Sequence, residues 1–542
     1  MRPGSAGTLG PTLAAVTLGP CCQAIATELD RHLDSSDASA STVADDVRAV
    51  RAGLDQPLRV AVTGRVNAGK STIVNALLHQ RIAATDVSEC TRHVTWFRYG
   101  VPERVEVVLR NGERRPVRLR EDGRLPLRLD LDADLQTGLD SDGDEPAPSV
   151  DHLDVFLSND SLQDLVLIDT PGIASLDAEA SGATRELLAI DRSSRAAAAQ
   201  ADVLVFVLGG ELQRDDTGFL EAFHRLFTGL SATAVNTVAV LNKVDQLVDD
   251  ELDPVTSAAD RCARLSRQLR STVADVVPLV GLLAETAESG VLTQSDLELL
   301  RAAAGREERA VERALLSTDR FLRSTEIAAE PHQRERLLEL LDLSGTRIVL
   351  DVLRAADVGL QHAVDAIRTR SGLHRLWALL RGEFVAHADV LKAAAGLNGI
   401  ERVAYRATGD ERTRLLDLLD GLEVVPVMHR LRELSARQRV AAGEIPLTAE
   451  QDAELRRLFG VGGLMARLGL PAGTTVADAM EHALRRAQQW KQLANDAGGS
   501  STRRDAAAIT SRSYELLWQE LVTSPPAVSW PPPAPSATAP PA

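Results

Sequence analysis

The fold is decided by the stretch Leu58-Arg-Val-Ala-Val-Thr-Gly64-Arg-Val-Asn-Ala-Gly69-Lys70-Ser71-Thr72. Residues 60–62 predict a buried strand, because a short apolar, β-branched run that ends at a glycine is typical of one. Gly64-x-x-x-x-Gly69-Lys70-Ser71 then has the spacing of a phosphate-binding P-loop, and the apolar run after it predicts a helix. Since strand, loop and helix occur in this order, a chance glycine-rich turn is the poorer interpretation.

This loop predicts the phosphate chemistry of a nucleotide site. Glycines let the backbone wrap a phosphate, and its amides converge as donors at the start of a helix. We expect Lys70 to reach the β- and γ-phosphates and the Ser71 hydroxyl to ligate Mg²⁺. The predicted phosphate-binding residues are Gly64, Asn67, Ala68, Gly69, Lys70, Ser71 and Thr72.

A second phosphate motif, Asp169-Thr-Pro-Gly172, follows another apolar strand pattern downstream of the P-loop. At the end of a strand Asp169 can hold Mg²⁺ through water, and the Gly172 amide can meet the γ-phosphate. The tetrapeptide is a weak signal alone, but its place after a strand and a P-loop makes it a strong one. We therefore expect Asp169 and Gly172 to belong to the nucleotide site.

The motif Asn242-Lys243-Val-Asp245 indicates which base is bound. A carboxylate can accept hydrogen bonds from N1–H and from the 2-amino group of guanine, whereas adenine would leave a buried carboxylate unpaired. We expect Lys243 to stack along the base and Asn242 to brace the loop. The predicted ligands are GTP and GDP with Mg²⁺, and ATP is a poor alternative.

Such a site also needs a mobile threonine that completes Mg²⁺ coordination and orders a switch loop. Thr91 is the first choice because it lies in a polar loop pattern, and Thr95 is the runner-up because it already belongs to a strand pattern. The predicted Mg²⁺ ligands are therefore Ser71, Thr91 and Asp169.

Composition limits the remaining possibilities. With 542 residues, 44% of them hydrophobic, the chain can form two or three domains with sizeable cores. A net charge of −17 argues against a nucleic-acid-binding protein and requires any attraction to anionic lipid to be local. No apolar run approaches the ~20 residues that span a bilayer. The four cysteines lack metal-ligand or disulfide spacing, so we expect a cytoplasmic protein that can still lie on a membrane surface: Cys21, Cys22, Cys90 and Cys262.

Strand patterns alternate with helical patterns between residues 58 and 285, which indicates an α/β fold with a mostly parallel, doubly wound sheet. Asn111-Gly112 predicts a β-hairpin with a type I′ turn. Residues 121–150 are rich in Asp, Glu, Gly and Pro and predict a solvated acidic insertion. The predicted strands are a segment from 93 and residues 60–62, 105–109, 116–119, 152–157, 165–168, 201–208, 237–241 and 276–280.

Helical periodicity dominates both ends of the chain. Residues 21–33 and 42–54 carry it before the P-loop strand, and their apolar face needs helices from elsewhere in the chain. Beyond about residue 285 the pattern is almost wholly helical. Residues 524–542 are rich in Pro and Ala and predict a disordered tail.

Four stretches together resemble the bacterial dynamin family, most closely its actinobacterial branch of isoniazid-inducible dynamin-like proteins. The resemblance implies GTP hydrolysis, self-association through GTPase domains, action on the inner face of the plasma membrane and Thr91 as the switch threonine. It is carried by Gly64-Arg-Val-Asn-Ala-Gly-Lys-Ser-Thr72, Glu89-Cys-Thr-Arg-His-Val-Thr-Trp-Phe-Arg-Tyr-Gly100, Leu167-Ile-Asp-Thr-Pro-Gly172 and Leu241-Asn-Lys-Val-Asp245.

The resemblance also implies a domain plan, in which an elongated α-helical trunk is built from segments before and after the GTPase domain. Ser371-Gly-Leu-His-Arg-Leu-Trp-Ala-Leu-Leu380 is similar to the final helix of such a GTPase domain. The expected parts are a flexible N-terminus (1–20), a helical arm (21–57), the GTPase domain (58–384, with the insertion at 121–150 and a helical part from about 285), the trunk (385–523) and the tail (524–542).

One departure concerns catalysis. Dynamins usually place a glutamine, which positions the attacking water, where this chain has Val66. We therefore expect catalysis to depend on Lys70, Thr91, backbone groups and Asn67. Arg65 could stabilise charge in cis, although a solvent-facing arginine is at least as good an interpretation.

The helical part predicts two candidate membrane loops, residues 421–428 and 459–470. The second combines small and apolar residues with Arg467, which suits interfacial insertion. For both loops, an ordinary interhelical corner packed into the trunk is the favoured interpretation. Two functions stay open: a self-associating GTPase that remodels or repairs the inner membrane, and a soluble switch GTPase whose helices bind a protein partner. Another dynamin-like protein as partner would reconcile them.

Overall fold

The computed structural model describes residues 18–35, 43–83, 93–117, 150–171, 200–210, 212, 216–218, 220, 221, 236–247, 252–356, 358–441, 443–445, 447–496 and 498–523. Nearly all of the predicted flexible N-terminus and acidic insertion, and the whole predicted tail, lie outside them. The chain divides into two compact units, Met1–Glu423 and Val424–Ala542.

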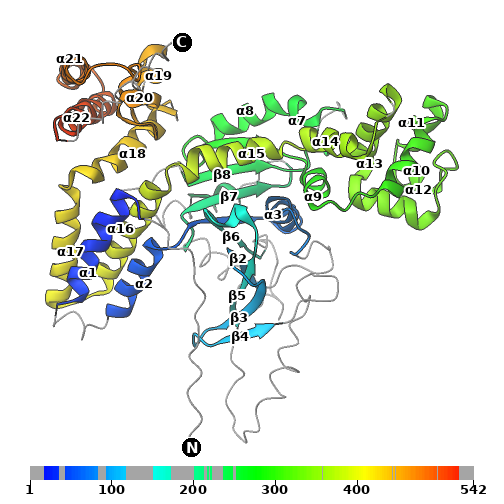
Figure 1. The fold of residues 1–542 in the computed structure, drawn as a ribbon, viewed down its shortest axis with the longest axis horizontal. Coiled ribbons are helices and arrows are strands. Elements are labelled where there is room, and N and C mark those ends of the chain that lie inside the picture. The colour runs from blue at the N-terminus through cyan, green and yellow to red at the C-terminus, as the bar shows by residue number, and fades with distance from the viewer. Residues whose placement is uncertain are drawn as a thin grey trace, which may run out of the picture. The chain divides into compact units, whose positions relative to one another are not determined.

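The bounds of the described elements follow, with the labels of Figure 1. The strands are β1 (Leu58–Gly64), β2 (Val94–Tyr99), β3 (Arg104–Leu109), β4 (Arg114–Val117), β5 (Val150–Leu157), β6 (Leu165–Asp169), β7 (Val203–Leu208), β8 (Thr237–Leu241) and β9 (Asp275–Pro278). The helices of the first unit are α1 (Pro20–Leu33), α2 (Ala44–Leu54), α3 (Lys70–Leu78), α7 (Pro254–Ser257), α8 (Ala259–Gln268), α9 (Gly281–Ser289), α10 (Gln294–Ala304), α11 (Glu308–Ala314), α12 (Thr318–Arg323), α13 (Pro331–Ala355), α14 (Leu360–Ser371), α15 (Leu373–Leu379), the π-helix η5 (Leu380–Val385), α16 (Ala388–Arg406) and α17 (Gly409–Glu423), with short 3-10 helices η2 (Asp160–Leu162) and η4 (Val244–Gln246). The helices of the second unit are η6 (Pro426–Met428), α18 (His429–Ala441), α19 (Ala449–Leu458), α20 (Leu464–Leu468), α21 (Val476–Ala494) and α22 (Ser501–Thr523).

The nine described strands form one sheet with the order β4-β3-β5-β2-β6-β1-β7-β8-β9. The five strands from β6 to β9 in this order are parallel, β2 is parallel to β5, and the pairs β2–β6, β3–β5 and β3–β4 are antiparallel. β6, β7 and β8 are buried along their whole length, as expected for parallel strands covered on both faces. The predicted α/β fold with a mostly parallel sheet is confirmed.

The hairpin between β3 and β4 differs from the prediction in its turn. A type I′ turn needs positive φ at both central residues, but only Gly112, with φ 83°, has it. The Leu109 amide donates to the Glu113 carbonyl at 2.9 Å, so the loop holds three residues rather than two. The prediction of a type I′ turn is therefore wrong: a single left-handed residue closes the longer loop.

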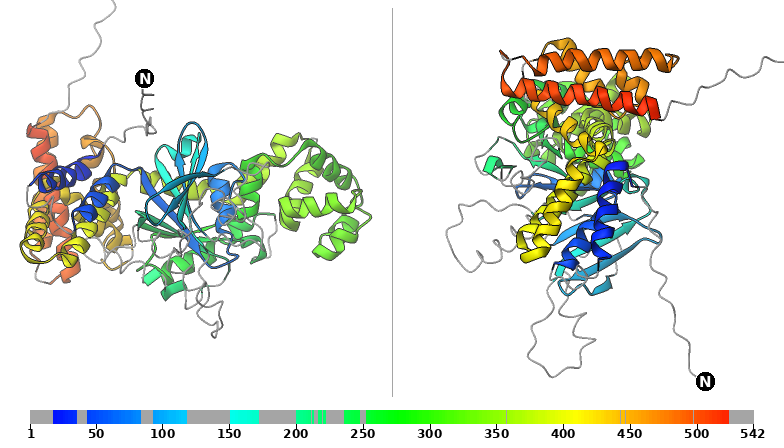
Figure 2. Two further views of the ribbon diagram at one scale, coloured as in Figure 1. Left: turned by 90° about the horizontal axis from the view of Figure 1, so that it is seen from below. Right: turned by 90° about the vertical axis from the view of Figure 1, so that its left-hand side faces the viewer.

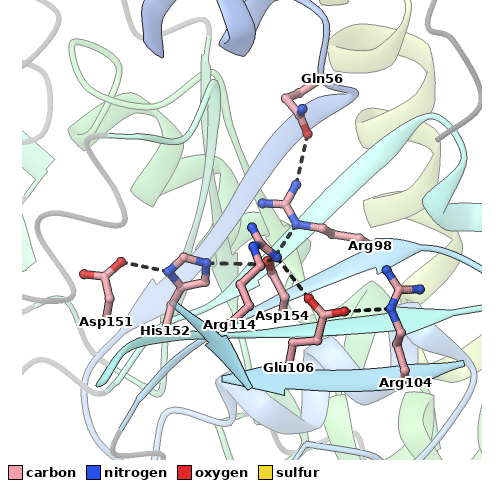
Figure 3. A network of polar contacts seen from close by, with 8 residues as sticks. All are labelled: Gln56, Arg98, Arg104, Glu106, Arg114, Asp151, His152 and Asp154. Carbon is pink, nitrogen blue, oxygen red and sulfur yellow. Dashed lines mark hydrogen bonds and ion pairs between the residues drawn. The ribbon is translucent and has the colours of Figure 1, made fainter. Parts of the chain in front are cut away.

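One face of the antiparallel part of the sheet carries a network of charged side chains, drawn in Figure 3. Asp154 on β5 is buried and accepts from Arg98 Nε and Arg114 Nη1, each at 2.8 Å. Burial alone would raise the pKa of Asp154, but hydrogen bonds from His152 and Arg98 hold it well below its usual range. Arg98 also donates to Gln56, so the network joins β2 to the segment that precedes β1.

The N-terminal helices pack on helices from much later in the chain. Figures 1 and 2 show α1 and α2 beside α16 and α17, and α16 contacts both N-terminal helices. The Asp389 carboxylate accepts from the backbone N–H groups of Cys21 and Cys22 at 2.9 Å, which caps the start of α1. Both cysteines are buried free thiols. The expected pairing of this arm with distant helices is thus present in the first unit.

The second unit has a core of its own. Figure 2 shows α21 and α22 as a long pair, and Trp490 and Tyr514 from these helices are buried between them and α19. At the centre the buried Glu454 carboxylate accepts from Tyr514 at 2.6 Å, from Trp490 Nε1 at 3.1 Å and from Arg486. A buried acceptor with three donors is fully satisfied, so this network fixes how α19, α21 and α22 meet.

Residues 459–470 form a corner of this unit in which Arg467 and Leu468 are buried, although Val461 is 54% exposed. Arg467 is buried and forms an ion pair with Glu433 at 2.9 Å, while its Nε donates to the Leu458 carbonyl at 2.7 Å. Leu468 and Phe459 lie in the core. The alternative that Arg467 serves interfacial insertion is therefore wrong, because its charge is already paired. Within the described residues no helix is long and apolar enough to cross a membrane.

Substitution of Lys392 tests the contacts between α16 and the segment that joins α2 to β1. Its ammonium is buried on α16 and donates to the Leu54 carbonyl at 2.6 Å and to the Gln56 carbonyl, just before β1. We expect Lys392→Met to lower the free energy of unfolding by about 2–4 kcal/mol, because both carbonyls lose their donor. Urea unfolding followed by circular dichroism measures this change.

The matched control is Lys491→Met, which replaces an exposed lysine of the second unit and should leave the transition in place. Equal stability of the two variants would mean that the Lys392 contacts contribute nothing.

Candidate functional site

The candidate site lies where the parallel strands end. The carboxyl ends of β1, β6, β8 and β9 meet at one edge of the sheet, which is where open α/β sheets bind ligands. The loop from Arg65 to Gly69 joins β1 to α3, and its residues turn their backbone toward the start of that helix. Lys70 is buried, and its Nζ donates to the Arg65 carbonyl at 3.0 Å, so the ammonium spans the loop.

Asn242 connects the loop of the base motif to the P-loop and to the start of α9. Its Nδ2 donates to the Ala68 carbonyl at 2.8 Å, and its Oδ1 accepts from the Gly281 amide at 2.8 Å. Gly69 makes this possible: its φ is 92°, and a Cβ there would lie 2.2 Å from Asn242 Nδ2. Lys243 completes the tie, since its Nζ donates to the Asn67 carbonyl at 3.0 Å.

Ser71 and Asp169 present hard oxygen ligands at the same place. The Ser71 hydroxyl donates to Asp169 Oδ2 at 3.0 Å, and Asp169 Oδ1 is buried with no hydrogen-bond partner among the described residues. Burial raises the pKa of Asp169 to about 6, although Lys70 and Ser71 act in the opposite direction. An orphaned carboxylate oxygen beside a hydroxyl fits Mg²⁺, which prefers oxygen ligands. Bound there, the ion would neutralise charge on the nucleotide phosphates.

Asp245 stands at the start of the 3-10 helix η4, directly after Lys243 and Val244. Burial, and next the negative charge of Asp342, raise the pKa of Asp245 to about 6. Asp342 lies in a kink of α13, far along the chain, with the unusual backbone angles φ 53° and ψ −171°. The structure thus places a second carboxylate near the base motif, which no motif of the sequence indicates.

The structure brings most of the predicted site residues to this edge of the sheet. Arg65 is half-buried there, whereas the side chains of Val66 and Asn67 are exposed. Thr95, the runner-up for the switch threonine, is buried within β2 and 2% exposed. Thr91 and Gly172 lie outside the described residues. The predicted residues that meet here are Gly64, Arg65, Asn67, Ala68, Gly69, Lys70, Ser71, Thr72, Asp169, Asn242, Lys243 and Asp245.

Three residues of this region were not predicted from the sequence. Gly281 follows β9, and its place after the last strand is the only signal that could have indicated it. Asn75 on α3 is buried: its Nδ2 donates to Glu285 at 2.7 Å, and its Oδ1 accepts from the Ala83 amide at 2.8 Å. Asn75 and Glu285 therefore hold the segment that leads toward Thr91, and only the fold brings them together.

Comparisons with known proteins agree with this site. The sequence model of a family described as 50S ribosome-binding GTPase matches residues 59–243. The isoniazid-induced protein IniC of Mycobacterium tuberculosis, from strains CDC 1551 / Oshkosh and ATCC 25618 / H37Rv, is 33% identical over 452 residues, which are 82% of this chain and 86% of that protein.

Two solved structures also match this chain. An oligomerised bacterial dynamin pair is 14% identical with a TM-score of 0.30, over 92% of this chain and 73% of its own. Era of Aquifex aeolicus bound to GDP·AlF4⁻ is 16% identical with a TM-score of 0.23, over 46% of this chain and 68% of its own.

The raised pKa of Asp245 predicts how guanine-nucleotide affinity depends on pH. Only the ionised carboxylate accepts from both guanine donors, so affinity should be constant well above pH 6 and fall by about tenfold per pH unit below it. Asp342→Asn removes the second cause of the raised pKa and should move the midpoint of this fall to lower pH. Equilibrium titration of GDP in EDTA measures both midpoints.

The GDP phosphates titrate identically with both proteins, so the difference between the midpoints reports the protein alone. Coinciding midpoints would contradict the effect of Asp342 on Asp245.

Proposed function

This chain belongs to the family of the isoniazid-induced protein IniC, a family of dynamin-like GTPases, and we propose that it uses Mg²⁺ to hydrolyse GTP, self-associates through its GTPase domains and acts peripherally on the inner face of the plasma membrane. The family and the P-loop make it a protein that binds guanine nucleotide and hydrolyses GTP. The proposal adds Mg²⁺ as the bound ion, self-association through the GTPase domains and peripheral action on the membrane.

The observation that carries the membrane role is the distribution of charge between the two units. Val424–Ala542 contains 13 Arg and Lys and 11 Asp and Glu, a net charge of +2, whereas the whole chain carries −17. Residues 1–423 therefore carry −19. Charge asymmetry of this kind favours contact of one part with an anionic surface, and a lipid headgroup layer is such a surface.

Within the second unit, cationic side chains gather on α19 and α21. Arg457, Arg485 and Arg486 are near enough to His482 that, after burial, their charges lower its pKa. Arg457 and Arg485 are exposed, and the apolar side chain of Leu484 beside them is 48% exposed. Exposed arginines next to an apolar side chain suit a headgroup region, where the charge binds phosphate and the apolar group enters the interface.

The P-loop supports self-association. Val66 is 41% exposed beside the phosphate site and cannot hydrogen-bond an attacking water. A second copy packed against this surface would cover the apolar side chain and exclude water from the reaction. We propose that turnover is fastest in such an assembly, formed with a copy of this chain or with another dynamin-like protein.

We also propose the division into domains that the dynamin resemblance implies. Residues 58–384 act as the GTPase domain, and residues 21–57 with 385–523 act as the helical trunk. Packing of α1 and α2 on α16 supports the part of this plan in which the N-terminal helices pack on a helix that follows the GTPase domain.

Within the site, we propose that Lys70 and the P-loop amides hold the β- and γ-phosphates, and that Ser71, Thr91 and Asp169 hold Mg²⁺. Gly172 meets the γ-phosphate, while Asp245 reads the base beside Lys243. In this proposal Asn67, which is exposed with φ 62°, orients water, and Arg65 is the candidate for charge stabilisation in cis.

Substitution of the two polar candidates tests the catalytic part. We expect Asn67→Ala and Thr91→Ala each to lower kcat by about 10- to 1000-fold, because each removes a group that acts on the attacking water or its charge. Single-turnover GTP hydrolysis measures the effect, and Gln80→Ala, an exposed polar residue after α3, is the matched control. Normal hydrolysis by both variants would refute these assignments.

Turnover against protein concentration tests assembly and membrane action together. The specific rate should rise with concentration, and rise further on vesicles that contain anionic lipid, with Lys70→Ala as the blank. Reversing two charges, Arg457→Glu with Arg485→Glu, should abolish the vesicle effect and keep hydrolysis in solution, because about 1 kcal/mol of attraction is lost per basic residue at such a surface.

The matched control reverses two exposed arginines of the first unit, Arg306→Glu with Arg309→Glu. A rate that is flat with concentration and indifferent to lipid would favour the second candidate, a soluble switch GTPase whose helices bind a protein partner.

A further inference from the structure

Helix α13 is broken at one residue whose backbone is in a region that glycine normally occupies. Asp342 has φ 53° and ψ −171°, between two stretches of ordinary helix. An L-residue adopts these angles only where its surroundings compel it, and such strain is concentrated at functional sites. Ser344 and Gly345 follow two and three residues later, and such a pair favours a kink in a helix, but the positive φ lies at Asp342 and not at Gly345.

The kink is held against the helix that starts at the base site. Thr286 on α9 donates to the Leu340 carbonyl at 2.6 Å, and Gly345 packs so closely on Leu283 that a Cβ would lie 2.3 Å from its Cδ2. The first residue of α9, Gly281, is the one whose amide binds Asn242. The broken turn of α13 is therefore fixed to the loops that surround the base motif.

The carboxylate of Asp342 is only partly used within the protein. Its Oδ1 accepts from the Leu343 amide at 2.7 Å, and no hydrogen bond to Oδ2 is present among the described residues. The first contact resembles a helix N-cap, but N-cap residues normally have β-region angles, so capping does not require this strain. The charge of Asp342 is felt at Asp245, whose pKa it raises.

Guanine has one donor more than Asp245 can use. Its N1–H and one hydrogen of the 2-amino group pair with a single carboxylate, which leaves the second amino hydrogen without a protein partner. A second carboxylate beside the first would accept it. The two negative charges repel one another in the free protein, and a donor placed between them relieves that repulsion.

We propose that Asp342 is a specificity-determining residue that accepts a hydrogen bond from the guanine 2-amino group, opposite Asp245. This inference rests on the guanine site alone and deepens it by naming a second group that reads the base.

The test compares GTP with ITP, whose base lacks the 2-amino group. At pH 8 Asp245 is ionised in every variant, so the pH effect described above does not enter. We expect Asp342→Gly and Asp342→Asn to lower the ratio of GTP to ITP affinity by about tenfold, mainly through weaker GTP binding. Equilibrium dissociation constants are measured for the full-length protein with both nucleotides.

Two readouts separate this role from a structural one. Removal of a negative charge acts on both triphosphates alike, whereas loss of a contact to the 2-amino group weakens GTP binding and leaves ITP binding unchanged. Glycine suits the backbone angles at this position, so Asp342→Gly should fold with an undiminished Tm.

The matched control is Asp351→Asn, which neutralises an exposed carboxylate on the same helix and should leave the ratio unchanged. A ratio that stays the same in both Asp342 variants, or GTP and ITP affinities that fall together, would overturn the proposal. The measurement uses neither vesicles nor assembly, so its outcome is independent of the proposed membrane role.

Discussion

The site depends on the side chain of Asn242. One amide group binds the carbonyl of Ala68 in the P-loop and the amide of Gly281 after β9, and so fixes three loops from distant parts of the chain. The contact exists only because Gly69 has no side chain to block it. The P-loop and the loop with the Asn-Lys-Val-Asp motif are therefore held together through one side chain.

A second set of contacts joins this site to the helical arm. Asp202, at the start of β7, accepts from the backbone and guanidinium of Arg59 on β1, with Nη2 at 2.6 Å. Lys392 on α16 holds the carbonyls just before the same strand, and Arg98 on β2 reaches Gln56. The segment between α2 and β1 is thus held by α16 and β2, while Asp202 holds β1 itself. A shift of the P-loop strand must act on α16, because buried charged contacts have few alternative arrangements.

The second unit differs in kind from the first. Its core is closed around Glu454, Phe459 and Leu468 are packed into it, and Arg467 is paired internally. Its net charge of +2 is opposite in sign to that of residues 1–423. A membrane contact of this unit would therefore rest on exposed arginines rather than on a buried apolar loop.

The sequence by itself determined the parallel sheet, the P-loop, the aspartate at the end of β6 and the Asn-Lys-Val-Asp motif, because each depends on residues that are neighbours in the chain. Strand runs of β-branched residues and a glycine-lysine-serine loop carry their meaning locally. The hairpin turn at Gly112 was mispredicted because a pair such as Asn111-Gly112 is compatible with both two- and three-residue loops.

Only the tertiary structure decided which distant groups meet. Asn75 with Glu285, Asn242 with Gly281, and Asp342 beside Asp245 are separated by tens of residues or more, and no periodicity or spacing links them. The same holds for Arg467, whose charge looked available until its partner Glu433 was placed beside it. Local pattern specifies elements, whereas burial and pairing of polar groups depend on the packing of the whole chain.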